Sequence, residues 1–227
     1  YTNWVRTFSC ADGNERIPRI AHENGLKTMV GAWLGKDLGD NEKEIANLIE
    51  IARAGYADNV AVGNEVLYRD DLSEEQLIAY IDRVKKALPE LQVGYVDAYY
   101  EFVNRPLLTD ACDVVFANCY PYWEGCDFEY SLLYMKDMYH RVSKAAKGKK
   151  VVISETGWPS QGTAHEAAEP SVGNALKYFI NTQEWARDDD LEVFYFSSFD
   201  EDWKIGDEGD VGAYWGIWDK NGELKFE

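Results

Sequence analysis

Short, mostly apolar runs alternate with amphipathic segments along the chain. The apolar runs are nearly continuous at their centres, which is typical of strands buried on both faces of a sheet. They predict seven strands, at Trp4–Phe8, Lys27–Ala32, Asn59–Gly63, Gln92–Tyr95, Val114–Asn118, Lys150–Ser154 and Glu192–Phe196. This alternation predicts repeated strand–helix units and a parallel sheet.

The segments between the strands carry apolar residues at helical spacing. Four helices are predicted in this way, at Asn41–Ala54, Ser73–Leu88, Leu132–Gly148 and Pro170–Arg187. The second has the clearest boundaries, because Ser73 and Gln76 form a capping box at its start and Pro89 stops it.

The strand count decides between two parallel α/β folds. Seven strands are one fewer than a closed (β/α)8 barrel contains. The competing doubly wound sheet usually carries a glycine-rich turn after its first strand, whereas Ser-Cys-Ala-Asp-Gly follows Trp4–Phe8 and the chain has no G-x-G-x-x-G motif. We therefore predict a TIM-type barrel with one strand–helix unit fewer than the closed form. No linker or low-complexity stretch divides the chain, so residues 1–227 are expected to form a single domain.

The composition restricts the possible partners. The chain has 23 Lys and Arg residues against 41 Asp and Glu residues, for a formal net charge of −18. Such a chain repels phosphate backbones and anionic membranes, so we expect a neutral substrate and no nucleic acid. No apolar run approaches the ~18 residues of a membrane span.

Metal and cofactor chemistry find little support. The chain has four cysteines, Cys10, Cys112, Cys119 and Cys126, and three histidines, His22, His140 and His165. None has metal-ligand spacing, and free thiols are favoured over a bridge between Cys119 and Cys126. Walker and G-x-S-x-G motifs are absent, and the acidic run Asp200–Asp210 lacks an EF-hand pattern. We expect neither a metal nor a cofactor.

Carboxylates follow two of the predicted strands. Glu65 comes after Asn59–Gly63, and Glu155 comes after Lys150–Ser154. In a barrel both would reach the face formed by the carboxyl ends of the strands, where function resides. Aromatic residues follow the same and neighbouring strands. Two carboxylates among aromatic rings are typical of a glycosidase, in which one carboxyl protonates the glycosidic oxygen and the other attacks the anomeric carbon.

Several segments resemble glycoside hydrolase family 17, the β-1,3-glucanases. They are Val62-Gly63-Asn64-Glu65-Val66, Asn118-Cys119-Tyr120-Pro121-Tyr122, Ile153-Ser154-Glu155-Thr156-Gly157-Trp158-Pro159-Ser160, Phe199-Asp200-Glu201 with Lys204, and Tyr214-Trp215-Gly216-Ile217-Trp218. Their order and spacing fit across nearly the whole chain. Family members begin with a further strand and helix, so the resemblance implies that this chain is a TIM-type barrel that lacks its first strand and helix and is truncated at its N-terminus.

The resemblance also implies roles for individual residues. It implies a retaining mechanism, with Glu65 as the acid/base and Glu155 as the nucleophile, within roughly 7 Å of each other. Asn64 would bond the sugar 2-hydroxyl, and Glu201 and Lys204 would form an auxiliary charged pair. The implied sugar contacts are Tyr120, Tyr122, Trp158 and Trp215.

The leading hypothesis is therefore an enzyme that cleaves internal β-1,3 bonds of a glucan such as laminarin. A β-1,3-glucanosyltransferase would use the same carboxylates and pass the sugar to another sugar hydroxyl. The alternative that is not an enzyme is a catalytically silent barrel that binds a glucan. We expect a monomer that is secreted or periplasmic.

Overall fold

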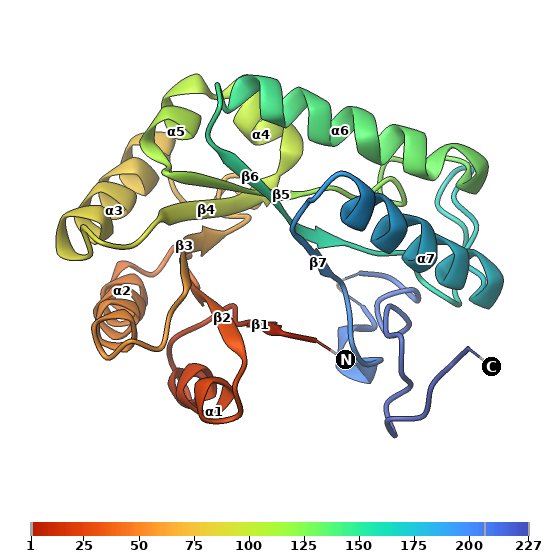
Figure 1. Cartoon of the computed structure of the whole chain (residues 1–227), viewed down its shortest axis with the longest axis horizontal. Coiled ribbons are helices and arrows are strands. Elements are labelled where there is room, and N and C mark those ends of the chain that lie inside the picture. The colour runs from red at the N-terminus through yellow and green to blue at the C-terminus, as the bar shows by residue number, and fades with distance from the viewer. Residues whose placement is uncertain (1, 207, 227) are drawn as a thin grey trace. The chain divides into compact units, whose positions relative to one another are not determined.

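A computed structural model describes residues 2–206 and 208–226. Its sheet contains seven strands in the order β1-β2-β3-β4-β5-β6-β7, and the recorded strand pairs are parallel (Figure 1). In a TIM-type barrel, neighbouring strands follow one another in sequence order. In a doubly wound sheet, the strand order reverses at a switch point. The predicted α/β class with seven parallel strands in barrel order is confirmed, and an α-helix follows each of the first six strands.

The boundaries of the elements are as follows. The strands are β1 (Trp4–Arg6), β2 (Lys27–Ala32), β3 (Asn59–Asn64), β4 (Val93–Ala98), β5 (Val114–Asn118), β6 (Lys150–Thr156) and β7 (Val193–Tyr195). The α-helices are α1 (Ile17–Glu23), α2 (Leu38–Arg53), α3 (Glu74–Ala87), α4 (Tyr99–Asn104), α5 (Pro106–Ala111), α6 (Ser131–Ala145) and α7 (Val172–Asp188). Short 3₁₀ helices lie at Asn14–Arg16, Phe128–Tyr130 and Asp202–Lys204.

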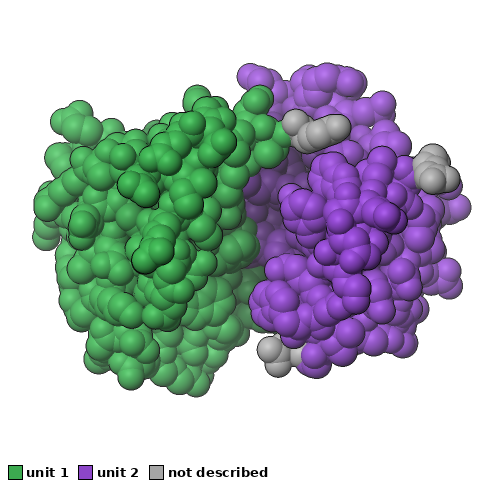
Figure 2. Space-filling view, turned by 90° about the horizontal axis from the view of Figure 1, so that it is seen from below, with its two compact units in different colours: residues 1–117, 142–151 green, residues 118–141, 152–227 purple. Residues whose placement is uncertain are grey.

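The residues group into two units, which Figure 2 shows in different colours. The first unit contains residues 1–117 and 142–151, and the second contains residues 118–141 and 152–227. The single-domain organisation stays a prediction.

The first unit is built on the central strands and the helices that cover them. All six residues of β3 are buried, as are five of the six in β2. Helices α2 and α3 pack on these strands (Figure 1). In α3 the apolar residues at helical spacing, Leu77, Ile81 and Val84, are completely buried. The hydrophobic effect of this burial fixes which face of the helix meets the sheet.

Hydrogen bonds at the helix starts agree with the sequence. The Ser73 hydroxyl accepts from the Gln76 amide, and the Gln76 side chain accepts from the Ser73 amide, so the predicted capping box forms. Helix α7 begins with the Ser171 hydroxyl accepting from the Asn174 amide at 3.0 Å. These bonds satisfy amides that lack a partner within the helix.

The second unit has an aromatic core. Trp158, Tyr122 and Tyr178 are each at most 1% exposed. The chain after β7 is tied to this unit by Lys225, whose Nζ donates to the Asp200 carboxylate at 2.7 Å and to the Ser160 hydroxyl at 2.8 Å. The Lys225 side chain is only 9% exposed, so pairing with Asp200 offsets the cost of removing its charge from water.

Three strands extend further than predicted. The prediction ended β3, β4 and β6 at Gly63, Tyr95 and Ser154, whereas they end at Asn64, Ala98 and Thr156. Glu155 therefore lies within β6 instead of after it. The reason is that the ladder continues, since the Thr156 carbonyl accepts from the Phe196 amide at 2.8 Å.

All four cysteines lie in the described part of the chain and carry free thiols, as favoured from the sequence. Among the described residues, no helix is long and apolar enough to cross a membrane.

A glycine in β4 makes a testable packing prediction. A Cβ added at Gly94 would lie 2.3 Å from the Val114 carbonyl oxygen and 2.6 Å from the Phe116 ring. Gly94→Ala should therefore lower the free energy of unfolding by about 1–3 kcal/mol, the usual cost of overpacking. Urea unfolding measures this change.

Gly173 in α7 supplies the matched control, because an added Cβ there meets nothing within 4 Å. Gly173→Ala should raise the free energy of unfolding by about 0.4–1 kcal/mol. Equal effects of the two substitutions would contradict the packing described for β4.

Candidate active site

Glu65 directly follows β3 in the first unit. Its amide donates to the Val96 carbonyl at 2.8 Å, and its backbone is left-handed, with φ of 51°. Such a conformation is uncommon for a residue with a side chain and persists where surrounding contacts enforce it. The side chain is half-buried. Glu65 thus occupies a backbone position that is held firmly by its surroundings.

Gly63 lies two residues before Glu65 and allows the backbone to pass close to two neighbouring side chains. Its φ is 92°, and a Cβ there would lie 2.8 Å from the Val66 side chain and 3.2 Å from the Tyr95 ring. Glycine alone avoids both the steric clash and the conformational strain.

Two arginines hold the polar groups beside Glu65. Arg6 donates to Asn64 Oδ1 at 2.6 Å. The side-chain nitrogen of Asn64 is the other group that can form hydrogen bonds, as a donor. Arg69 donates to the Asn64 and Leu34 carbonyls and pairs with Asp71 at 2.7 Å. Neither arginine was predicted from the sequence, since Arg6 lies within a strand and Arg69 lies in the loop beyond the segment that contains Glu65.

Glu155 lies in the second unit and is 8% exposed. Its Oε2 accepts a hydrogen bond from the Tyr120 hydroxyl at 2.9 Å, and its carbonyl accepts from the Cys119 amide at 2.9 Å. The next residue in β6 is also fixed, because the Thr156 and Tyr178 hydroxyls are 2.6 Å apart. A carboxylate with a hydroxyl donor on one oxygen is well placed for nucleophilic chemistry through its other oxygen.

The predicted sugar contacts of the second unit form one aromatic cluster. Tyr122 meets Trp158 and Trp215 edge to face, with ring centroids 5.4 Å apart in both pairs. Tyr120 meets Trp215 at 5.6 Å. Tyr122, Trp158 and Trp215 are at most 3% exposed, whereas Tyr120 is half-buried. Edge-to-face contacts of this kind stabilise a core. Sugar binding by these rings stays a prediction, and Tyr120 has the most accessible ring of the four.

The predicted charged pair forms in the second unit. Lys204 Nζ lies 2.7 Å from Glu201 Oε2 and 4.0 Å from the centre of the Phe196 ring. Phe196 in turn meets the Tyr120 ring, with the centroids 6.4 Å apart. A chain of contacts thus links the pair to the tyrosine that bonds Glu155.

The predicted site residues therefore fall into two groups. Asn64 and Glu65 lie in the first unit, and all the others lie in the second. The separation between Glu65 and Glu155 stays a prediction. Among the described residues, no group of three His, Cys, Asp or Glu side chains could hold a metal ion.

Comparison with known families identifies the class of protein. Residues 1–216 match the family described as the BtgE/BtgC glycoside hydrolase domain. The strand order agrees with a barrel glycoside hydrolase. The chain belongs to glycoside hydrolase family 17, which confirms the resemblance found in its sequence.

Curated relatives support this membership. The chain is 29% identical to a glucan 1,3-beta-glucosidase of Saccharomyces cerevisiae over 100% of this chain and 80% of the relative. It is 28% identical to a glucan 1,3-beta-glucosidase of Candida albicans over 98% of this chain and 80% of the relative.

A solved structure extends the similarity to the fold. The glycoside hydrolase family 17 beta-1,3-glucanosyltransferase from Rhizomucor miehei matches with a TM-score of 0.90 and 30% identity, over 99% of this chain and 84% of that chain. An active-site mutant of the Rhizomucor miehei enzyme was solved in complex with laminaritriose. An endo-laminarinase from Formosa shares the fold at a TM-score of 0.77 and 18% identity, over 98% of this chain and 75% of that chain.

The Tyr120–Glu155 hydrogen bond makes a testable prediction. Tyr120→Phe removes a donor to a carboxylate, an interaction worth about 1.5–3 kcal/mol. We expect kcat/KM for a laminari-oligosaccharide to fall about 10- to 100-fold. Steady-state kinetics measure the change.

Tyr130→Phe is the control, since Tyr130 belongs to the same unit and is 61% exposed. The two variants should differ in rate while keeping similar melting temperatures. A Tyr120→Phe enzyme as fast as Tyr130→Phe would contradict the role of this hydrogen bond.

Proposed function

We propose that the chain is a β-1,3-glucan-active glycosidase that retains anomeric configuration through a covalent glycosyl-enzyme intermediate. The observation that carries this proposal is family membership over residues 1–216, together with Glu65 and Glu155 at the ends of their strands. The names of the relatives support a β-1,3-glucan as the substrate, as does the laminaritriose bound to the Rhizomucor miehei enzyme.

The proposed reaction has two steps. In the first, the Glu155 carboxylate attacks the anomeric carbon, the bond to the glycosidic oxygen breaks, and the Glu65 carboxyl gives its proton to that oxygen. In the second, the Glu65 carboxylate takes a proton from the incoming hydroxyl, which attacks the anomeric carbon and releases Glu155. Two inversions give a product with retained configuration.

Residues around the carboxylates have supporting roles in this scheme. Asn64, oriented by Arg6, would bond the sugar 2-hydroxyl through its amide nitrogen. The Glu201–Lys204 pair would present charge and hydrogen-bonding groups to sugar hydroxyls. Tyr120, Tyr122, Trp158 and Trp215 remain the proposed aromatic contacts to the sugar.

The identity of the incoming group separates two functions. Our leading proposal is hydrolysis of internal bonds, with water as the acceptor. The second candidate is glucanosyl transfer to a sugar hydroxyl, which is favoured by the 30% identity and TM-score of 0.90 to the Rhizomucor miehei glucanosyltransferase. The chemistry differs only in the acceptor, so the product distribution decides between the two.

Incubation with laminaripentaose tests the reaction directly. Hydrolysis predicts shorter products only, and transfer predicts products longer than the pentaose, both resolved by chromatography. Binding of the oligosaccharide without any new product would overturn both proposals and support a silent glucan-binding barrel. We further propose that the protein acts outside the cytoplasm, in line with its similarity to a cell surface mannoprotein of Candida albicans.

Separate substitutions test the assigned roles. Glu155→Gly should abolish hydrolysis, and added azide or formate should restore turnover with an inverted product, because the small anion replaces the nucleophile. Glu65→Ala should slow laminari-oligosaccharides by about 100- to 10,000-fold while largely sparing an activated aryl glycoside, whose leaving group needs no proton.

The stereochemistry of azide products, read by nuclear magnetic resonance, distinguishes the two glutamates. Glu65→Ala with azide should give the β-glycosyl azide, which has retained configuration. Exchange of the two stereochemical results between the variants would reverse the assignment. Two fully active variants would place the catalytic site elsewhere.

A further inference from the structure

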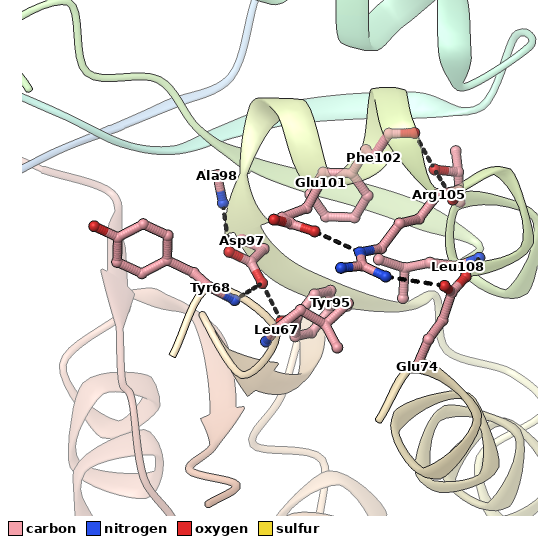
Figure 3. A network of polar contacts seen from close by, with 11 residues as sticks. Leu67, Tyr68, Glu74, Tyr95, Asp97, Ala98, Glu101, Phe102, Arg105 and Leu108 are labelled. Carbon is pink, nitrogen blue, oxygen red and sulfur yellow. Dashed lines mark hydrogen bonds and ion pairs between the residues drawn. The ribbon is translucent and has the colours of Figure 1, made fainter. Parts of the chain in front are cut away.

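Two buried polar residues of β4 contact the loop that carries Glu65. Tyr95 and Asp97 are both 0% exposed. The Tyr95 hydroxyl donates to Asp97 Oδ2 in a short hydrogen bond and accepts from the Leu67 amide at 3.0 Å (Figure 3). Neither side chain was selected from the sequence, and the proposed reaction does not use either one.

The Asp97 carboxyl oxygens also accept hydrogen bonds from two backbone amides. Asp97 Oδ2 accepts from the Tyr68 amide at 3.4 Å, and its Oδ1 accepts from the Ala98 amide at 2.7 Å (Figure 3). Between these residues, the Val96 carbonyl accepts from the Glu65 amide. Three successive residues of β4 therefore bond the amides of Glu65, Leu67 and Tyr68.

This arrangement is costly to build. Burial raises the pKa of Asp97 to about 6, and burial together with the neighbouring Asp97 raises the pKa of Tyr95. The hydrogen-bond partners of Asp97 are a phenol and two amides, none of which carries positive charge. Well-packed apolar residues often serve stability as well as buried charges do. Polar groups with raised pKa values beside a site carboxylate are instead typical of functional positions.

The backbone of the loop at Glu65 needs contacts that hold it in place. Its left-handed backbone, with φ of 51°, costs energy that other contacts must offset. The direction of the Glu65 side chain is set by this backbone, because the Cα–Cβ bond turns with φ. Loss of the contacts to Leu67 and Tyr68 would allow the chain to relax toward an ordinary conformation and turn the carboxyl away.

We propose that Tyr95 and Asp97 are positioning residues that hold the Glu65 backbone in its left-handed conformation and thereby aim its carboxyl at the glycosidic oxygen. The inference rests on the proposed function, in which Glu65 is the acid/base. Neither residue touches substrate in this account, and both act through the loop.

The experiment uses the dependence of rate on the leaving group. Tyr95→Phe and Asp97→Asn are each assayed with a laminari-oligosaccharide and with 2,4-dinitrophenyl β-laminaribioside. The parameter compared is kcat/KM, which reports the step in which the leaving group departs. A misplaced acid should lower kcat/KM for the oligosaccharide about 30- to 100-fold and for the aryl glycoside less than about 3-fold. A general loss of structure would lower both equally.

Three further variants make the outcomes distinguishable. Glu65→Ala gives the full selectivity expected when the acid is removed. Thr28→Val removes a partly buried hydrogen bond to the Tyr56 carbonyl at the amino end of β2, and it should change the rates with the two substrates by the same factor. Thr109→Val does the same in α5, where the hydroxyl donates to the Phe102 carbonyl at 2.8 Å.

The results divide as follows. If Glu65→Ala shows no leaving-group selectivity, the proposed function fails. If Glu65→Ala is selective but Tyr95→Phe and Asp97→Asn slow both substrates equally, the positioning role is overturned. Tyr95→Phe keeps the volume of the ring, so the test does not depend on Asp97→Asn being folded. Rates are referred to the folded fraction measured by circular dichroism.

Discussion

Buried carboxylates that accept hydrogen bonds from backbone amides hold the strand-to-helix loops of the first unit. Glu44 of α2 accepts from the Cys10 amide at 2.7 Å and from the Trp33 amide at 3.1 Å, which ties down the chain after β1 and after β2. Asp97 does the same for the loop after β3. Loop amides that no backbone carbonyl reaches need another acceptor, and a carboxylate is a strong one. The position of Glu65 depends on this arrangement.

Much of the fold could be predicted because each strand is a nearly pure apolar run. The strands Lys27–Ala32 and Val114–Asn118 have the predicted boundaries, and α3 begins at its predicted capping box. Helices α1, α4 and α5, with six or seven residues each, are too short to display an apolar stripe. The extra length of β4 and β6 comes from hydrogen bonds to neighbouring chain segments, which local pattern does not encode.

In the candidate site, too, some features could be predicted from the sequence and others could not. Glu65 and Glu155 were predictable because a polar residue at the end of an apolar run lies at the carboxyl end of a strand. Asp97 also ends such a run, but the predicted strand stopped at Tyr95, so it carried no signal. Aromatic composition indicated sugar binding, yet it could not tell that Trp158 and Trp215 are buried while Trp203 is 74% exposed. Burial follows from tertiary packing and has no local signature.

The proposed reaction depends on Glu155, with one oxygen held by the Tyr120 hydroxyl, attacking the anomeric carbon and forming a covalent intermediate. The most direct measurement traps that intermediate with 2-deoxy-2-fluoro-β-laminaribiosyl fluoride, whose fluorine at carbon 2 slows release more than formation. Peptide mass spectrometry of the trapped protein then locates the sugar. We expect one laminaribiosyl group, on Glu155. A label on Glu65 or on any other carboxylate, or an active enzyme that the reagent leaves unlabelled and uninhibited, would contradict it.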